Sequence, residues 1–532
     1  MTKLIPFVTT VTLLFFIVTT QAQAPVLGLS ASFALFSSNG AVSNTGLSHL
    51  TGNIGTNNGS STNFGNVDGV MHDSDGTTAT AAAALIVAYN QLNAAIPNFF
   101  PAPLLGNGQT LSPGTYAIGQ TATLNNILTL DGGGNPNAVF IFQIQGAMSS
   151  AANAQVLLTN GALACNVFWK IEGLVNLATN TAMKGTIVAN NAAIVLNSGV
   201  TIEGRALSTT GAVTVSGVTV TTPLGCSAPI LTGPIKPVLN SVACYTLFSG
   251  NGAVTNTGVT FVTGDIGTNV GLTSGFQAGN VTGTIHSNPD VSTAQCAVDV
   301  NNVYSYLNTL PTNIELLYPA AFGQQLVLTP HTYLMNAATV LTGSVIFNAQ
   351  GNPDAVFVIK INGALSTSTY ASVVLENGAQ AKNIFWKIDG ATDINDYAIF
   401  KGTLIGNNGA VVLNTGVTIE GRVLTTSGGI ATFGINAQMT PGCSTLGIEN
   451  QTIVRPIAKF YPNPFSSVLN VSTTGFDTVS KLILFNALGE KVLETILQQE
   501  INEVPINLPS GMYYYQLTFE DGRQQVGKLI SQ

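Results

Sequence analysis

Charged side chains are scarce in this chain of 532 residues. Lys and Arg together number 16 and Asp and Glu 24, so charged residues make up 8% of the sequence and the formal net charge is −8. Soluble domains usually contain about a quarter charged residues, so solubility here must come from uncharged polar side chains. Basic residues form no cluster, which argues against nucleic acid as a partner. With 45% hydrophobic residues, the composition is also the reverse of a disordered chain.

Side chains that usually perform catalysis or bind metal ions are also few. His72 and His286 occupy equivalent places in two similar segments, but neither has a second His or Cys at ligand spacing. Residues 72–76, His-Asp-Ser-Asp-Gly, have a faint likeness to a calcium loop but lack its closing Glu. No pair of carboxylates is placed persuasively for glycoside hydrolysis. We therefore predict no catalytic residue, no metal site, no cofactor and no small-molecule substrate, and an enzyme is the least favoured class.

The five cysteines are too few for a disulfide scaffold. A disulfide between Cys165 and Cys226 is one alternative. The second half contains Cys244, Cys296 and Cys443, so any one disulfide among them leaves one free thiol. The sequence does not decide which pairs form.

Long apolar runs are missing except at the start of the chain. An apolar run at 4–18 follows the charged start and precedes the small residues around Ala22, which is the pattern of a secretory signal peptide over residues 1–22. The run is short for a membrane span. We expect a protein that is secreted or held at the outer cell surface.

The chain contains two copies of one sequence pattern. Residues 51–57, Thr-Gly-Asn-Ile-Gly-Thr-Asn, return as 263–269 with Asp265 in place of Asn53. Residues 166–173, Asn-Val-Phe-Trp-Lys-Ile-Glu-Gly, return as 383–390 with two conservative changes. The first pair is 212 positions apart and the second 217, so the duplication is collinear with a small insertion. Any function of one copy is therefore available twice.

A shorter period runs inside each copy. Residues 184–189 align with 203–208, and residues 401–402 with 420–421, each at a step of 19. Short β-branched runs broken by Gly and Asn suit a coil of three strands, which predicts parallel β-helices. The predicted fold is mainly β, with two tandem right-handed, triangular β-solenoids.

One segment of each copy departs from the strand pattern. Residues 78–94 are rich in Ala and have apolar residues at helical spacing, and residues 293–310 are the counterpart, with Val298, Val303, Tyr304 and Leu307 in the expected buried stripe. We predict one long helix alongside each solenoid. The Gly- and Asn-rich region before each helix is expected to cap an exposed strand edge.

The two copies and the segments around them divide the chain after the signal peptide into five parts. We expect solenoids at 25–225 and 240–443, a Pro-containing linker at 226–239, a second linker at 444–456, and a C-terminal domain at 457–532.

The repeated domains resemble the ice-binding-like family, whose members pair a triangular right-handed β-solenoid with a parallel helix and a capping loop. The resemblance implies an ice crystal surface as the partner and binding by adsorption, and we expect a monomer. It rests on the Thr-Gly-Asn-Ile-Gly motif, the Ala-rich segment and the motifs at 134–142, 166–169, 184–187 and 204–207.

The last part of the chain has alternating apolar runs separated by Asn, Gly and Pro, which predicts a small antiparallel β-sandwich. Its opening at 461–465, Tyr-Pro-Asn-Pro-Phe, and its Gly-Met-Tyr segment at 511–513 resemble the C-terminal sorting domain of type IX secretion cargo. This resemblance implies the type IX secretion machinery as a second partner.

Threonine on stacked strands suggests how such a protein would bind ice. Equivalent outward residues of neighbouring coils lie about 4.7–4.9 Å apart, and Thr holds its methyl and hydroxyl in place because it is stiff at χ1. The family's Thr-Ala/Gly-X-Thr/Asn pattern is met at 415–418. Our candidate ice-binding residues are Thr121, Thr123, Thr179, Thr181, Thr201, Thr210, Thr214, Thr415 and Thr418.

The two copies differ at these positions. Thr121 and Thr123 correspond to Ala338 and Val340, and the Thr-Asn-Thr at 179–181 corresponds to Asp-Tyr-Ala in the second copy. A carboxylate and a large ring would hydrate and roughen a flat face, so we expect the first copy to bind ice more strongly.

A cell-surface adhesin or carbohydrate-binding protein on the same scaffold is the alternative function, because a fold does not determine a function. A flat face without aromatic residues would favour ice, and a surface with exposed Trp or Tyr would favour glycans. The two tryptophans, Trp169 and Trp386, lie within apolar strands and are expected in the core.

Overall fold

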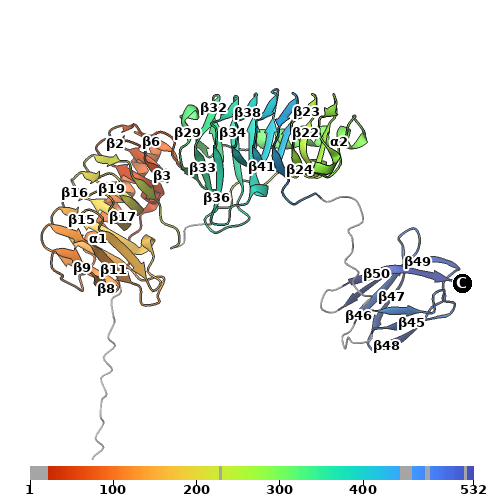
Figure 1. Cartoon of the computed structure of the whole chain (residues 1–532). Coiled ribbons are helices and arrows are strands. Elements are labelled where there is room, and N and C mark those ends of the chain that lie inside the picture. Colours follow the sequence, from red (N-terminus) through yellow and green to blue (C-terminus); the bar gives the residue numbers. More distant parts are fainter. Residues whose placement is uncertain (1–21, 227–229, 444–457, 474–479, 520–523) are drawn as a thin grey trace, which may run out of the picture. The chain divides into compact units, whose positions relative to one another are not determined.

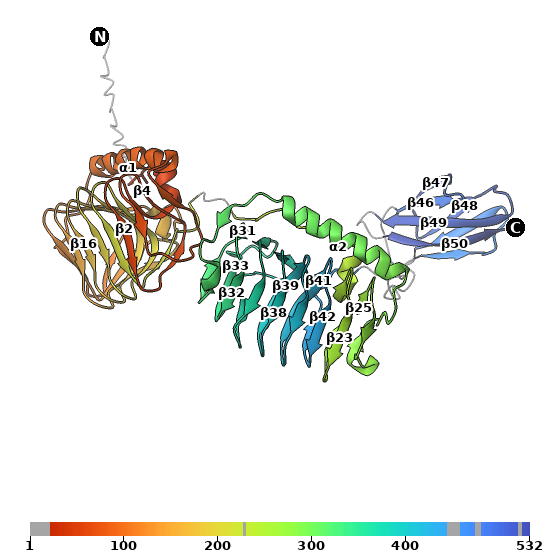
Figure 2. The same cartoon turned by 90° about the horizontal axis from the view of Figure 1, so that it is seen from above.

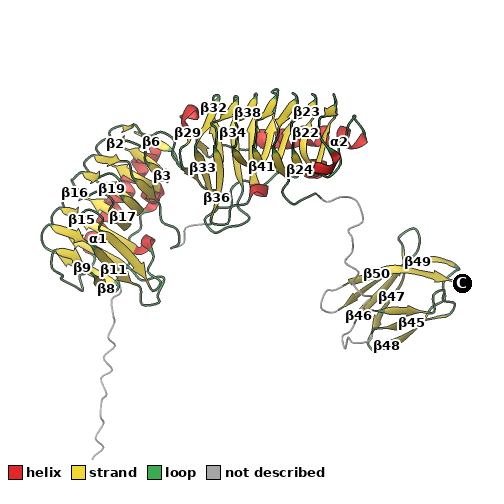
Figure 3. Cartoon of the chain, viewed as in Figure 1, coloured by secondary structure: helices red, strands yellow, loops and turns green. Residues whose placement is uncertain are grey.

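The computed structural model describes residues 22–226, 230–443, 458–473, 480–519 and 524–532. The chain forms two compact units, Met1–Cys443 and Ser444–Gln532. The first unit contains two β-solenoids of parallel strands and the second is antiparallel (Figures 1 and 3). The predicted fold class, two solenoids each with one long helix and a C-terminal antiparallel domain, is therefore confirmed.

The first solenoid has three faces. Face 1 carries the long helix, face 2 is a separate sheet of short strands, and face 3 shares β17 (Ala182–Ala189) and β19 (Thr201–Ser208) with face 1, because both strands bend at a glycine. Face 1 also contains β6 (Met71–Asp73), β4 (Asn53–Thr56), β1 (Phe33–Ser37), β15 (Val167–Ile171), β12 (Phe140–Ile144) and β9 (Gly114–Ile118); face 2 contains β5 (Ser61–Thr62), β2 (Val42–Thr45), β20 (Val213–Ser216), β18 (Ile194–Leu196), β16 (Val175–Leu177), β13 (Met148–Ser150), β10 (Ala122–Asn125) and β7 (Leu104–Gly106); face 3 also contains β3 (His49–Thr51), β21 (Thr219–Thr221), β14 (Gln155–Thr159), β11 (Ile127–Asp131) and β8 (Gln109–Leu111).

The second solenoid repeats this plan, and Figure 2 shows its helix lying along the stacked coils. Its bent strands are β39 (Ile399–Gly406) and β41 (Thr418–Thr425). Face 1 also contains β25 (Asp265–Thr268), β22 (Tyr245–Ser249), β37 (Ile384–Ile388), β34 (Phe357–Ile361), β31 (Thr332–Met335) and β28 (Ile314–Glu315); face 2 contains β26 (Thr273–Ser274), β23 (Val254–Thr257), β42 (Ile430–Phe433), β40 (Val411–Leu413), β38 (Thr392–Ile394), β35 (Leu365–Thr367), β32 (Thr339–Thr342) and β29 (Phe322–Gly323); face 3 also contains β27 (Val281–Thr282), β24 (Phe261–Thr263), β43 (Asn436–Gln438), β36 (Ser372–Glu376), β33 (Ser344–Asn348) and β30 (Leu326–Leu328).

The strands do not stack in chain order. β1 pairs with β19 and β2 pairs with β20, so the first strands of the domain are added next to its last full coil. β22 and β23 do the same in the second solenoid, against β41 and β42. Each solenoid is therefore closed by contacts between the two ends of its own sequence.

The core consists of the inward side chains of every strand. Tyr116, Phe142 and Trp169 stack along the axis of the first solenoid, with ring centroids 5.1 and 4.0 Å apart. Trp169 Nε1 donates to the Lys184 carbonyl at 2.9 Å, so this polar atom is satisfied within the core. Trp169 and Trp386 are both fully buried, which confirms the expectation that neither forms a surface platform.

The helices are α1 (Gly76–Ala94) and α2 (Val291–Thr309), and each begins at an Asp N-cap with a capping box. In the segment resembling a calcium loop, His72 Nδ1 lies 2.7 Å from a carboxylate oxygen of Asp75, the N-cap residue of α1. The stripe predicted for α2 was partly wrong. Val298 is exposed, because the stripe runs through Cys296 and Val300 instead.

A buried polar cluster fastens α1 to face 1. Lys170, on β15, has an almost fully buried side chain, and its Nζ lies 2.5 Å from Glu172 Oε1. Tyr89 on the helix donates to Glu172 at 2.6 Å, and Asn190 donates to its other oxygen at 2.7 Å. Burial raises the pKa of Glu172, but these hydrogen bonds and the Lys170 charge outweigh it, so the pKa is lowered. The carboxylate is therefore charged and balances the buried ammonium.

Removing this carboxylate should destabilise the protein. Glu172→Ala leaves the Lys170 ammonium buried without its counter-ion, which costs about 3 kcal/mol of unfolding free energy. Glu203→Ala is the matched control, because the Lys184–Glu203 pair is partly exposed and contributes about 1 kcal/mol or less. Denaturant unfolding checks both values, and equal losses in the two variants would contradict the assignment.

Two disulfides are formed, Cys165–Cys226 and Cys244–Cys443, while Cys296 is a buried free thiol on α2. The second bond joins the residue just before β22 to the segment that follows the last coil. It therefore reinforces the closure of the second solenoid.

The solenoids contact each other through a buried carboxylate. Asp68, in the cap region of the first copy, is buried and accepts hydrogen bonds from the Tyr333 hydroxyl at 2.5 Å and the Thr329 hydroxyl at 2.7 Å. Burial raises the pKa of Asp68, which the nearby His331 partly offsets. The linker also contacts the second copy, since Val356 N donates to the Thr232 carbonyl at 2.9 Å.

The C-terminal unit consists of two antiparallel sheets around a core that includes Phe465, Leu482 and Leu517. One sheet contains β44 (Lys459–Tyr461), β45 (Val468–Ser472) and β48 (Ile501–Pro505); the other contains β47 (Lys491–Leu497), β46 (Ser480–Phe485), β49 (Gly511–Phe519) and β50 (Gln524–Ser531). Residues 1–21, which contain most of the predicted signal peptide, and 444–457, which contain the second linker, lie outside the described residues.

Candidate functional site

Face 2 of the first solenoid presents one continuous column of outward side chains. Each strand of this face places apolar residues inward and small, mostly polar residues outward, and strand pairing puts the outward residues in register. Neighbours in the column are about 4.7–4.9 Å apart. From one end to the other, this central column consists of Leu104, Thr123, Ser149, Asn176, Val195, Thr214, Ser43 and Thr62.

The columns on both sides of it consist mostly of small residues. Two residues before the central column, the register gives mostly alanine, and two residues after it mostly Asn, Ala and Ser. No charged side chain occurs in the three columns. The flanking residues are Thr121, Ala147, Leu174, Ala193, Ala212 and Ala41 on one side, and Asn125, Ala151, Ala178, Asn197, Ser216 and Thr45 on the other.

The turn that follows face 2 is built from residues in the left-handed conformation. Asn126, Asn153 and Asn180 have φ of 52°, 60° and 59°, which Asn tolerates better than most residues. Asn180 Nδ2 donates to Asn153 Oδ1 at 3.3 Å, and Asn126 Nδ2 donates to Asn107 Oδ1 at 2.9 Å. Because successive coils turn in the same way, the strands of face 2 stay level with one another.

Hydrogen bonds also link side chains on the face itself. Thr123 Oγ1 and Ser149 Oγ lie 3.2 Å apart, and Asn197 Nδ2 donates to Asn176 Oδ1 at 2.9 Å. These bonds join neighbouring coils and limit the rotamers of the groups involved. Face 2 is therefore a rigid, uncharged array of methyl, hydroxyl and amide groups.

Three of the nine predicted residues lie on this face. Thr123 and Thr214 belong to the central column, and Thr121 belongs to the flanking column. Sequence reasoning missed Ser149 and Asn176, which share the central column. The 19-residue step leads from Thr214 through Val195 to Asn176, which a search for threonine passes over. The step does not reach Ser149, because Ser149 and Asn176 are 27 positions apart.

Two predicted residues lie on a different face. Thr201 and Thr418 are exposed on face 3, at the start of the bent strands. On the same face of the first solenoid, Lys184 Nζ pairs with Glu203 Oε2 at 2.7 Å. Face 3 thus combines threonine with ion pairs and lacks the uncharged character of face 2.

The remaining predicted residues occupy corners or the interior. Thr179 and Thr415 are exposed at the turn between faces 2 and 3, and Thr210 is exposed at the turn before face 2. Thr181 is fully buried and lies 2.7 Å from Ser150 Oγ. Its expected exposure is wrong, because the left-handed Asn180 turns the chain and directs Thr181 inward.

The second solenoid has a different face 2. Its central column contains more aliphatic residues, and Asp393 is exposed in the middle of it, where it accepts from Asn414 Nδ2 at 2.6 Å. The corresponding column is Val340, Ser366, Asp393, Val412, Ala431, Thr255 and Ser274.

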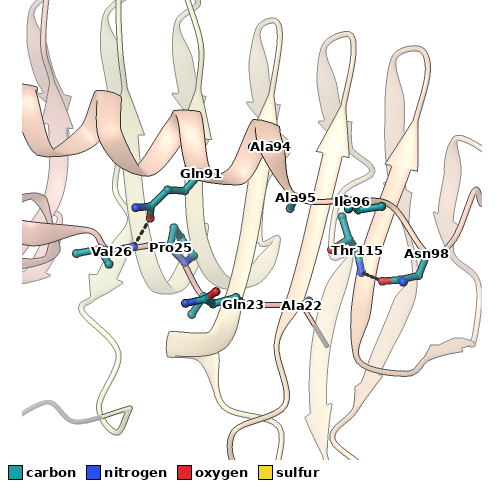
Figure 4. A pocket seen from close by; sticks show the side chains of 11 residues that line it. Ala22, Gln23, Pro25, Val26, Gln91, Ala94, Ala95, Ile96, Asn98 and Thr115 are labelled. Atoms are coloured by element: carbon teal, nitrogen blue, oxygen red, sulfur yellow. Dashed lines mark hydrogen bonds between the residues drawn. The ribbon is translucent and has the colours of Figure 1, made fainter. Parts of the chain in front are cut away.

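One cavity of the first solenoid lies outside face 2 and has no ionisable residue in its lining. A cavity of about 410 Å³ lies between the segment Ala22–Val26 and the end of α1 (Figure 4). Gln91 accepts from the Val26 amide there at 2.7 Å, and none of the lining residues is ionisable. Within the described ranges, no three His, Cys, Asp or Glu side chains are grouped to hold a metal ion. No helix in the same ranges has the length and apolarity to cross a membrane.

Comparison with known proteins identifies both repeated domains. The family described as Ice-binding-like matches residues 36–221 and again residues 248–435. The chain belongs to the ice-binding-like family. A second family, the secretion system C-terminal sorting domain, matches residues 459–532 of this ice-binding-like chain. Its C-terminal unit is therefore a type IX sorting domain, which directs export to the cell surface or the extracellular space.

Individual relatives agree with this membership. The chain is 74% identical to an ice binding protein of known structure from an Antarctic bacterium of the Flavobacteriaceae, which covers 80% of this chain and 100% of that one with a TM-score of 0.79. It is 41% identical to an ice-binding protein of Nostoc sp. (strain HG1), over 36% of this chain and 72% of the relative. It is 30% identical to an ice-binding protein of Colwellia sp, over 36% of this chain and 79% of the relative.

Proposed function

We propose that this chain is a secreted protein that adsorbs to ice through face 2 of its first solenoid. The observation that carries the proposal is the register of Thr123, Ser149, Asn176 and Thr214 in one uncharged column. A regular lattice of methyls and hydroxyls orders water into an ice-like layer that merges with a crystal face. Charged groups would hold water in shells that do not fit ice.

Rigidity is what makes such a face effective. Thr has few accessible rotamers, so its groups are ordered at little entropic cost. The hydrogen bonds between neighbouring coils and the stacked aromatic core of Tyr116, Phe142 and Trp169 hold the backbone in place behind the face. The face is therefore preorganised for a crystalline partner, which reduces the entropy lost on binding.

Adsorption accounts for an effect on ice without catalysis. A protein pinned at many points forces the growing ice front to curve between them, which lowers the local freezing point and slows recrystallisation. The proposal therefore includes no reaction and no cofactor, and it treats the protein as a monomer, because each molecule carries a complete face.

The second solenoid is proposed to contribute less. Asp393 places a hydrated carboxylate in the middle of its central column, where the first solenoid has Asn176. Val340 and Ala431 occupy the positions that hold Thr123 and Thr214 in the first column, so hydroxyl groups are fewer. Both changes weaken the match to an ice lattice.

The function is tested by growing single ice crystals in a solution of the intact exported protein. We expect faceted crystals and arrested coarsening of polycrystalline ice, because adsorption acts on specific crystal planes. A denatured sample of the same protein is the control. Round crystals that coarsen as they do in buffer would contradict the proposal.

A further inference from the structure

A stacked pair of tyrosines stands on the surface of the second solenoid. Tyr370 and Tyr397 follow β35 and β38 at the turn between faces 2 and 3, with 69% and 49% of their surfaces exposed. Their ring centroids are 5.2 Å apart and the rings are inclined by 12°. Because the two rings are stacked, their exposed apolar surfaces adjoin and form one patch that is open to a partner.

The backbone beneath the pair is unfavourable for tyrosine. Tyr370 has φ of 59° and Tyr397 has φ of 58°, in the left-handed region that bulky side chains rarely adopt. The equivalent residues of the first solenoid, 217 positions earlier, are Asn153 and Asn180, with φ of 60° and 59°. The same turn thus forms with a residue that suits it, so folding does not account for the tyrosines. Strain of this kind is a reason to look for function.

The surroundings leave one ring face of the pair open. At the same turn of the next coil, a Cβ on Gly416 would come within 2.4 Å of the Tyr397 ring, so the missing side chain makes room for that ring. On the side of Tyr370, the turn residue is Gly343, where an added Cβ would meet nothing within 4 Å. The Tyr397 ring thus packs against the turn at Gly416. The turn at Gly343 has no side chain that covers the outer face of the Tyr370 ring.

Two hydrogen-bond acceptors lie close to the rings in sequence, Asp396 at the corner itself and Asp393 on the preceding strand β38 of face 2. Asp396 precedes Tyr397 and accepts from the Thr415 amide at 3.0 Å through one oxygen, and Asp393 accepts from Asn414 through one oxygen. Neither carboxylate forms an ion pair with any residue that the structure describes. Each therefore keeps an oxygen to accept bonds from hydroxyl groups of a ligand.

We propose that this tyrosine corner, Tyr370 with Tyr397 and the adjoining Asp393 and Asp396, binds a pyranose ring of a polysaccharide. The flat C–H face of a sugar stacks on the open Tyr370 ring, and its hydroxyls donate to the carboxylates. The two solenoids then have different partners, with ice on the first and a glycan on the second. This activity does not depend on ice binding and would hold the protein on a polysaccharide matrix.

Native affinity electrophoresis of the intact protein tests the proposal. Separate gels contain laminarin, hydroxyethylcellulose or pullulan, which are soluble glucans with different linkages. We expect retardation in at least one gel and no retardation of the double variant Tyr370→Asn/Tyr397→Asn. Because this variant restores the residues of the first solenoid, its thermal unfolding should be unchanged or shifted upward.

Two controls separate a specific site from other effects. Tyr318→Asn removes an exposed tyrosine outside the corner, so this variant should be retarded like the unmodified protein. Ice shaping should be the same in the unmodified protein and the double variant, which separates this site from face 2. Equal migration of the unmodified protein with and without all three glucans would overturn the proposal, as would retardation of the double variant equal to that of the unmodified protein.

Discussion

Replacing Thr123 and Thr214 with tyrosine should reduce the thermal hysteresis of the whole protein to a small fraction of its original value. Both side chains stand in the central column of face 2, one near each end. A ring at either position projects above its neighbours and holds the ice surface away from the groups around it. Adsorption needs the whole array at once, so two obstructions should remove most of the activity rather than a proportional share.

Thr201→Tyr is the matched control for this double variant. Thr201 is an exposed threonine on the same solenoid, but it lies on face 3. Its hysteresis should equal that of the unmodified protein, while circular dichroism confirms that all variants are folded. If the two face 2 substitutions left hysteresis unchanged and Thr201→Tyr removed it, the ice-binding face would be face 3.

Loss of the Cys244–Cys443 disulfide should have the largest effect on stability. This bond closes a loop with a sequence separation of 199 residues, and loop entropy alone gives it roughly 5 kcal/mol of unfolding free energy. It also holds together the two sequence ends of the second solenoid, where β22 pairs with β41. Cys244→Ala/Cys443→Ala should therefore unfold at a much lower denaturant concentration.

The other disulfide provides the comparison. Cys165–Cys226 spans a separation of 61 residues, so its removal should cost slightly less, roughly 4 kcal/mol. Urea unfolding under non-oxidising conditions measures both double variants against the unmodified protein. If Cys244→Ala/Cys443→Ala had the same midpoint as the unmodified protein, the bond would not be needed for closure.

Most of the fold could be predicted from the sequence because it depends on local repetition. The step of 19 residues between 184–189 and 203–208 is the register of β17 on β19, where Lys184 lies beside Glu203. The helix at 78–94 was recognisable from its composition and begins at Gly76, two residues earlier than expected. In both cases the residues that carry the sequence signal are close in sequence to the residues whose structure they predict.

The insertion of β1 and β2 beside the last coil could not be predicted in the same way. Their pairing with β19 and β20 joins residues about 170 positions apart, as in Leu35 with Ala206, and no local pattern encodes it. A parallel strand accepts any neighbour of suitable apolar pattern, so the order of the coils follows from the whole domain.

The candidate residues show where pattern reading fails. The Thr-Asn-Thr of 179–181 looks like a row of alternating outward residues, but Asn180 adopts a left-handed turn and sends the next side chain inward. Asn176 belongs to the central column although it is not a threonine. Which of three faces a residue joins depends on the position of each corner, and that position is set by single residues such as Asn153 or Gly199.

The most direct test of the central claim is the uptake of the intact protein into a slowly growing ice hemisphere. The fraction of protein in the ice is compared for the unmodified chain and for Thr123→Tyr/Thr214→Tyr. We expect the unmodified protein to be concentrated in the ice and the variant to remain in the liquid like an ordinary solute. Equal exclusion of both proteins would contradict ice binding, and equal uptake would contradict face 2 as the site.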